Sequence, residues 1–289
     1  MYCETALTAY LVDMIFGEIP FIRHPVVLMG DFIKWFEKHF YKDSVSRGFV
    51  LFIALTSLTF TISFYIAFFI QNVWIQGIIA STALASNMLY RSVREIISAP
   101  EKIKYLVSRD TEKLTESEIC RAAVETYAEN LSDGVIAPFL YLLLFGLPGV
   151  FVYKAVNTLD SMVGYRNSRY ERFGKVSARV DDILNFIPAR ITAFLIIAVS
   201  GSAAGIIKLF KQAGGHSSPN AGWPITAMAL ALNIKLGGPT SYFGKIKDKP
   251  FFGTGRDELI PDDIRRALAF QWRIDLLLLF SVTASLFNL

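Results

Sequence analysis

The stretch YKAVNTLDSMVGY, residues 153–165, places polar side chains directly behind an apolar run. Lys154 and Asn157 recur at helical spacing, and either Asp160 or Ser161 continues the series. One face of a helix leaving the membrane would therefore carry an ammonium, an amide and a carboxylate. Because charged groups beside a membrane are costly, this face indicates a functional site.

The next segment, residues 166–190, is rich in groups that bind phosphate and metal ions. Its basic residues are Arg166, Arg169, Arg172, Lys175, Arg179 and Arg190. Two adjacent aspartates, Asp181 and Asp182, lie among them. Guanidinium and ammonium groups bind phosphate oxygens, and paired aspartates are typical ligands of magnesium that carries a nucleotide. Anchoring of the arginines to lipid headgroups is the alternative. Their interleaving with Asn and Asp favours a phosphate and metal site.

A third set of candidates lies in ETYAENLSDGVIAP, residues 125–138. Glu125 and Glu129 are four residues apart, Asn130 follows, and Asp133 comes one helical turn later. These acids would share one helix face, where they repel each other unless a cation lies among them. A solvated helix face is the ordinary alternative. An apolar span follows this acidic helix face directly, which favours a functional role for the acids.

The fourth candidate is the loop SSPNAGWP at 217–224, with Ser218, Pro219, Asn220 and Gly222. Glycine lets a backbone approach a ligand and proline stiffens the loop, although an ordinary turn has the same composition. His24 and His216 lie in motif regions, where we expect them to stabilise loops. The two cysteines form no CxxC pair or Cys/His cluster, so neither a zinc site nor a disulfide scaffold is predicted.

The elements that must position these residues are helices in a membrane. Hydrophobic residues make up 53% of the chain, aromatic residues 14% and charged residues 19%, which is more apolar than a soluble globular protein. The formal net charge of +4 is small and scattered, so we predict no nucleic-acid partner. The chain is predicted to be all-α, a polytopic integral membrane protein with helical hairpins, broken or re-entrant helices and cytoplasmic amphipathic helices.

We predict a single membrane-embedded domain over residues 1–289. Its spans are predicted near 49–70, 73–90, 135–153, 191–210 and 274–289. The first has no charge over the ~20 residues that a bilayer core requires. Pro138 and the GLPG sequence at 146–149 predict that the span at 135–153 is broken.

Basic residues flank the hairpin at 49–90 on both sides, so both flanks are predicted to be cytoplasmic. The segment 91–130 would then be a cytoplasmic helical segment with two amphipathic helices. The sequence TESE at 115–118 predicts a capping box at the start of the second.

Taken in chain order, five motifs resemble those of adenosylcobinamide-phosphate synthases, the CobD/CbiB family of cobalamin biosynthesis. The motifs are HPVVLMG, ETYAENLSDGVIAP, YKAVNTLDSMVGY, FGKVSARVDDILNFIPAR and SPNAGWP. They cover essentially the whole chain. The resemblance implies an integral membrane enzyme that joins the propionate of adenosylcobyric acid to aminopropanol or its O-phosphate. The bond is an amide, and the reaction consumes ATP with Mg²⁺, with the adenosylated corrinoid as substrate.

The resemblance also implies functional positions. Those given catalytic roles are Glu129, Asp133, Lys154, Asp160 and Arg179. Those expected to bind substrates are Glu125, Asn130, Asn157, Ser161, Tyr165, Arg190, Ser218, Pro219, Asn220 and Gly222. Gly164 and Pro188 lie in the same motifs. Asp181 and Asp182, with Asp160 as a further candidate, would hold Mg²⁺.

Two alternatives come from other classes of protein. A transporter for a corrinoid or anionic substrate would also place charges beside broken spans, but such proteins often contain inverted repeats and we find none. A non-catalytic carrier or sensor would not need intact charged motifs. The enzyme reading predicts a multi-pass protein of the cell membrane with its active site on the cytoplasmic side. Its partners would be the lipid bilayer and its small-molecule substrates, and self-association or contact with other corrinoid-pathway enzymes stays open.

Overall fold

The structure is a computed structural model that describes residues 2–17, 23–165, 167–201, 205–242 and 244–287. The chain divides into two compact units. The first consists of Met1–Asn87, Ala137–Asn185 and Val282–Leu289, and the second of Met88–Ile136 and Phe186–Ser281. Almost all of the regular structure is helical, which confirms the predicted all-α class.

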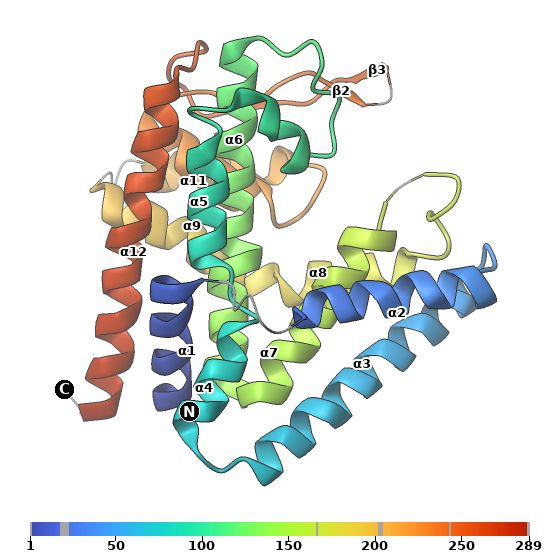
Figure 1. Ribbon diagram of the computed structural model, residues 1–289. Helices are drawn as coiled ribbons and strands as arrows, with labels where there is room; N and C mark the ends of the chain where they lie inside the picture. The colour runs from blue at the N-terminus through green and yellow to red at the C-terminus, as the bar shows by residue number, and fades with distance from the viewer. Residues whose placement is uncertain (1, 18–22, 166, 202–204, 243, 288–289) are drawn as a thin grey trace. The chain divides into compact units, whose positions relative to one another are not determined.

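The first unit is built from long apolar helices. Its elements are α1 (Cys3–Phe16), α2 (Pro25–Phe40), α3 (Val45–Phe69), α4 (Val73–Ser81), α7 (Ala137–Val163) and α8 (Lys175–Leu184). Helix α1 packs on α4, while α7 packs on α2, α3 and α8. In Figure 1, α2 and α3 diverge from the short connection between them. Helix α7 is therefore the central support of this unit.

Short helices and small hairpins make up most of the second unit. Its helical elements are α5 (Ser86–Glu95), η1 (Pro100–Tyr105), α6 (Glu116–Asn130), η2 (Leu131–Ile136), α9 (Phe186–Ser200), α10 (Gly205–Gln212), η3 (Ala213–Gly215), α11 (Gly222–Leu232) and α12 (Pro261–Phe287). Its strands are β1 (Leu236–Gly237), β2 (Thr240–Tyr242), β3 (Lys245–Lys247) and β4 (Phe251–Phe252). The antiparallel pairs are β1 with β4 and β2 with β3. Helix α11 packs on α6, α9 and α10 and forms the core of this unit.

Three helical runs in the described residues are long and apolar enough to cross a membrane, namely Val45–Phe69, Glu116–Val163 and Pro261–Leu286. The helices Lys175–Leu184 and Phe186–Ser200 meet the same criteria together as a bent pair. Only 17% of the residues in the most apolar 18-residue stretch of α3 are buried. Its exposed side chains include Phe64, Phe68 and Phe69. Because so apolar a surface is unfavourable in water, the composition of α3 fits contact with lipid.

The helix boundaries refine the predicted spans. The stretch 73–90 is two helices, α4 and α5, because the chain turns at 82–85 instead of continuing one helix. The predicted span at 191–210 falls on α9 and α10, with residues 202–204 outside the described part. That at 274–289 falls on the later part of α12, which begins earlier, at Pro261, and residues 288–289 lie outside the described part.

The predicted break in α7 is confirmed. Gly146 has φ +65° and ψ −156° inside the helix and Pro148 follows it, so the GLPG sequence interrupts the helical hydrogen bonds as expected. The capping box is also confirmed, because Thr115 and Glu118 bond reciprocally at the start of α6. The earlier of the two predicted cytoplasmic helices is only the short 3-10 turn η1.

Gly48 allows α3 to pack closely on the connection before α8. A Cβ atom at this position would lie 1.7 Å from the carbonyl oxygen of Phe173. We therefore expect Gly48→Ala to lower the free energy of unfolding by about 1–3 kcal/mol, as overpacking does, measured by denaturation in detergent. Gly214→Ala is the matched control, because a Cβ there meets nothing within 4 Å. Equal stability of both variants would contradict the close contact.

Candidate active site

A polar network joins α7 and α8 in the first unit, and Asp181 is its centre. The Asp181 side chain is buried. Its carboxylate accepts one hydrogen bond from Asn157 Nδ2 at 3.4 Å and another from Asn185 Nδ2 at 2.9 Å. Lys154 lies near enough for its positive charge to act on Asp181. The structure therefore brings Lys154 and Asn157 of α7 to a carboxylate of α8, Asp181, whereas the carboxylate that helical spacing predicts on their own helix face is Asp160.

Two tyrosines support this network from α7. Tyr153 donates from its hydroxyl to Asn185 Oδ1 at 2.8 Å. The ring of Tyr141 stacks on that of Tyr153 with centroids 4.8 Å apart, and its hydroxyl donates to the Leu184 carbonyl at 3.0 Å. Tyr141, Tyr153 and Asn185 are not among the site residues predicted from the sequence. A signal was present, because Tyr153 is four residues before Asn157 and Asn185 four residues after Asp181.

The other predicted positions of this unit differ in exposure. Arg179, Ser161 and Tyr165 are exposed, whereas Asp160 and Asp182 are partly buried. A Cβ at Gly164 would lie 2.6 Å from the backbone carbonyl oxygen of Asp160. Gly164 is therefore needed for packing beside Asp160. Arg166 lies outside the described residues.

The donor set of this unit fits magnesium that arrives on a nucleotide. Among the residues that the structure describes, no group of three His, Cys, Asp or Glu side chains could hold a metal ion by itself. Mg²⁺ bound to a nucleotide needs only one or two carboxylates, because phosphate oxygens and water complete its shell. Asp181 and Asp182 are adjacent in α8, so their side chains point in different directions. Asp181 is the more buried of the two. The metal roles of Asp160, Asp181 and Asp182 stay predictions.

In the second unit, Glu125 is part of a buried ion pair. The side chain of Glu125 is 9% exposed and that of its partner Arg109 is 14% exposed. Glu125 Oε2 accepts from Arg109, and its other oxygen accepts from the Gly237 backbone N–H at 2.6 Å. Burial opposes the charge on Arg109, but the charge and hydrogen bond of Glu125 raise the pKa of this guanidinium. A solvated helix face is therefore the wrong description of Glu125.

The remaining residues of the acidic motif lie where the α-helix α6 changes to a π-helix. Glu129 and Asp133 are partly buried, and Asn130 is exposed and donates to the Thr126 carbonyl at 2.9 Å. Residues Leu131–Ile136 form the π-helical segment η2, which packs on α9. Such wide turns occur frequently at functional sites. The wider turn also takes Asp133 off the regular four-residue spacing that the sequence predicts.

Arg190 on α9 joins the SSPNAGWP loop. Its Nη1 donates to the Phe186 carbonyl at 2.6 Å and to Asn220 Oδ1 at 3.4 Å. The guanidinium lies over the rings of Phe186 and Trp223, at 3.4 and 4.6 Å from their centroids. Cation–π contacts of this kind hold an arginine in a fixed orientation. Arg190 and Asn220, both predicted to bind substrate, are thus brought together.

The loop itself is held by its own side chains. Ser218 Oγ accepts from the Asn220 and Ala221 backbone N–H groups at 3.2 and 3.3 Å. Pro219 is exposed, whereas Asn220 is buried. A Cβ at Gly222 would lie 2.1 Å from the Ala213 carbonyl oxygen. Glycine is therefore required here by close packing against the preceding turn.

Both motif histidines accept a backbone hydrogen bond, His24 as the N-cap of α2 and His216 within its loop. His24 Nδ1 accepts from the Val26 backbone N–H at 3.3 Å, and His216 Nδ1 accepts from Ser218 N–H at 3.0 Å. The cysteines Cys3 and Cys120 are free and buried. In the described residues, therefore, neither cysteine belongs to a disulfide.

The contact of His216 predicts a pH dependence of this loop. Burial, aided by the charge of Lys249, lowers the pKa of His216 below its ordinary value of 6.5. The neutral ring therefore stabilises the folded protein above pH 6.5, and this contribution is lost as the pH falls from there through the folded-state pKa. We expect the melting temperature of the wild type to fall over this window more than that of His216→Asn. The asparagine oxygen can accept from the Ser218 N–H without titrating. Parallel curves would contradict the role of His216.

The structure brings some of the predicted site residues together in three groups, one in the first unit and two in the second. The first unit holds the cluster around Asp181 with Lys154, Asn157 and Asp182. The second holds Glu125 with Arg109, and Arg190 with Asn220. The helical architecture, the apolar spans and these buried charges define an all-α membrane protein with polar clusters beside its spans.

Comparison with known proteins gives the family. The model of the CobD/CbiB proteins matches residues 6–271. A cobalamin biosynthesis protein CobD from Geobacter metallireducens is 40% identical over 92% of this chain and 89% of its own length. The CbiB protein of Salmonella arizonae is 37% identical over 91% of each chain, and the CobD protein of Halalkalibacterium halodurans is 36% identical over 92% and 91%. No solved structure matches the chain. The chain belongs to the CobD/CbiB family of cobalamin biosynthesis.

Proposed function

We propose that this protein is an ATP-dependent amide ligase that joins adenosylcobyric acid to aminopropanol O-phosphate, or to aminopropanol, giving adenosylcobinamide phosphate or its unphosphorylated counterpart. The observation that supports this most directly is the network of Lys154, Asn157 and Asp181 in a member of the CobD/CbiB family. It places an ammonium, an amide and a buried carboxylate together, as binding of a phosphate and its metal requires.

The reaction needs an activated carboxyl group, because a propionate is a poor acyl donor at neutral pH. A propionate oxygen would attack the terminal phosphorus of ATP and form an acyl phosphate, while the bond from that phosphorus to the bridging oxygen breaks and ADP leaves. The amine would then attack the acyl carbon, so that the C–N bond forms and the C–O bond to phosphate breaks. Lys154, Arg179 and Arg190 are proposed to bind the transferred phosphate or the phosphate of the amino alcohol.

The amine must lose a proton before it can attack. Glu129 and Asp133 are the proposed acceptors of that proton, because both are carboxylates that are only partly buried. Asp181 and Asp182, with Asp160 as a further candidate, would hold Mg²⁺, which when bound neutralises charge on the phosphates. Glu125, Asn130, Asn157, Ser161, Tyr165 and the loop residues Ser218, Pro219, Asn220 and Gly222 would bind or orient the substrates. The active site is proposed to face the cytoplasm, where ATP is available.

The test is turnover by the purified protein in detergent, supplied with adenosylcobyric acid, aminopropanol phosphate, ATP and Mg²⁺. Mass spectrometry should detect a corrinoid heavier by one amide-linked aminopropanol phosphate, and only when ATP is present. Free aminopropanol in a parallel reaction decides which amine is preferred. Tight binding of the corrinoid without any product would overturn the ligase proposal and favour a carrier.

A further inference from the structure

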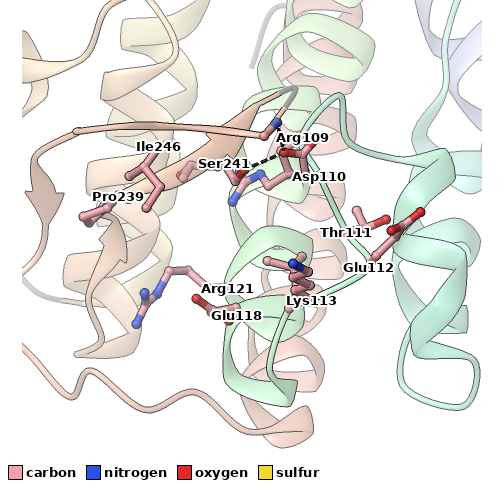
Figure 2. Close-up of a pocket in the computed structure, with 14 residues that line it drawn as sticks. Arg109, Asp110, Thr111, Glu112, Lys113, Glu118, Arg121, Pro239, Ser241 and Ile246 are labelled. Carbon is pink, nitrogen blue, oxygen red and sulfur yellow. Dashed lines mark hydrogen bonds between the residues drawn. The ribbon is translucent and has the colours of Figure 1, made fainter.

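Helices α6 and α12 of the second unit run side by side in the same direction. Ser117 Oγ accepts from the Leu259 N–H at 2.9 Å near the start of both helices, and further along the Tyr127 hydroxyl donates to Gln271 Oε1 at 3.1 Å. Figure 2 shows a cavity of about 870 Å³ at the starting end, beside the first turns of α6 and the β2–β3 hairpin. Its charged lining residues are Arg109, Asp110, Glu112, Lys113, Glu118 and Arg121. So many charges suit contact with water and not with lipid.

The character of α12 changes along its length. The charged residues of its first two turns are Asp262, Asp263, Arg265 and Arg266. Beyond Arg273 the helix has one charged residue, Asp275, and it exposes Leu276 and Phe280. Trp272 is exposed and lies with Arg273 where the change occurs. Tryptophan and arginine are typical of the boundary between membrane and water, where the ring and the charge reach the headgroups.

The end of α9 lies beside this boundary, and α10 packs close to it. Arg273 Nη1 donates to the carbonyl of Val199, in the last turn of α9, at 3.3 Å. Helix α10 then packs on α9 and α11. The ring centroid of Phe210 in α10 lies 6.1 Å from that of Phe194 in α9 and 5.2 Å from that of Trp223 in α11. Helix α10 is thus fixed near the level of α12 at which the charged half gives way to the apolar half.

One side of α10 is apolar and exposed. Leu209 packs inward and is buried. Ile206 and Phe210 are four residues apart and share a helix face, which Ile207 extends. Ile207 is 68% exposed and Phe210 is 59% exposed, even though Phe210 contacts two other rings. A helix of eight residues is about 12 Å long and is far too short to cross a membrane. Its apolar side can therefore enter the membrane only at the surface.

The adjacent side of α10 carries two lysines. Lys208 and Lys211 are three residues apart and both are exposed. Neither belongs to an ion pair among the residues that the structure describes. An apolar side next to a lysine side is the pattern of a helix that lies in the plane of an anionic membrane surface. A second copy of this chain could also cover the apolar residues, but the lysines favour a surface of opposite charge.

We propose that α10 is an interfacial helix that inserts Ile206, Ile207 and Phe210 among the lipid acyl chains and places Lys208 and Lys211 against the phosphate groups of anionic lipids. The membrane surface would then meet the second unit at α10 and at Trp272 of α12. The proposal does not depend on ligase activity, because it concerns contact with lipid alone.

The first experiment measures the depth of α10 with bimane-labelled Ile207→Cys in the full-length protein, reconstituted in phospholipid nanodiscs. Arg265→Cys, about 12 Å before Arg273 on α12, is the matched control for water, and Phe280→Cys is the control for lipid. Cys3 and Cys120 are buried, and the wild type carried through the same labelling measures their background. We expect lipids with a nitroxide near the headgroup to quench the label at 207 at least about twofold more than that at 265.

The second experiment tests the charge of the lipid. Quenching at 207 should be stronger in nanodiscs that contain phosphatidylglycerol than in phosphatidylcholine alone, and high salt should reduce the difference. Lys208→Gln combined with Lys211→Gln should abolish the difference. Lys245→Gln combined with Lys247→Gln removes the same charge from the exposed strand β3 and should preserve it.

Three results would overturn the proposal. The label at 207 could remain unquenched like that at 265, which would place α10 in water. Labels at 207 on two copies could quench each other while the lipid nitroxides have no effect, which would make α10 a contact between copies. Equal quenching in both lipid mixtures, with or without the two lysines, would remove the anionic headgroup. A protein without turnover that meets both expectations would sink the ligase proposal and keep this one.

Discussion

Replacing Glu125 by alanine is expected to lower the melting temperature of the detergent-solubilised protein by about 10 °C. The reason is the burial of its partner, since the Arg109 side chain is only 14% exposed. Without Glu125 the guanidinium keeps its charge but loses its counter-ion, which costs about 3–5 kcal/mol in buried pairs. The Gly237 N–H loses its acceptor as well. Differential scanning fluorimetry in detergent measures the change.

Two further variants separate charge from packing. Glu125→Gln keeps an acceptor for Gly237 but not the charge, so its melting temperature should lie between those of the wild type and Glu125→Ala. The double variant Arg109→Leu with Glu125→Leu removes both charges and should recover much of the loss, because paired apolar replacements are often tolerated. If Glu125→Ala melted like the wild type while losing corrinoid turnover, Glu125 would be a substrate ligand and not a structural one.

The Asp181→Ala variant is expected to lower turnover by at least about 100-fold. Asp181 is the buried carboxylate to which Asn157 and Asn185 donate, and we propose it as a ligand of nucleotide-bound Mg²⁺. Its removal should leave the transferring phosphate without the positive charge that stabilises it. Initial rates of product formation over a Mg²⁺ titration measure the effect. The apparent Mg²⁺ requirement of Asp182→Ala should also rise.

Loss of structure must be distinguished from loss of chemistry in this experiment. Removing the acceptor leaves two amide donors unsatisfied, which costs about 1–3 kcal/mol for a buried group. Asn185→Ala disturbs the same network but keeps the carboxylate. It should therefore lower stability while turnover falls much less than in Asp181→Ala. The exposed Asp43→Ala is the control for charge. Wild-type turnover by Asp181→Ala would refute the metal role.

Local features of the fold could be predicted from the sequence because they depend on neighbouring residues. The uncharged run of α3, the break at Gly146 and the capping box at Thr115 each rest on a few consecutive side chains. Helical spacing also predicted that Lys154 and Asn157 share a face with a carboxylate. Periodicity and composition describe only one element at a time. They therefore predicted a single helix at 73–90, whereas the chain turns at 82–85 and forms two helices.

Partners distant in the sequence were decided by the tertiary structure. Asp181 accepts a hydrogen bond from Asn157, which is 24 residues away in the sequence. Glu125 accepts one from the Gly237 N–H, which is 112 residues away. Neither pairing leaves a periodic signal, because each arises only when packing removes water and the buried charge must find a partner. The sequence by itself therefore determined the membrane helices and the chemical groups of the site. Tertiary packing alone decided which of these groups are buried and which are paired.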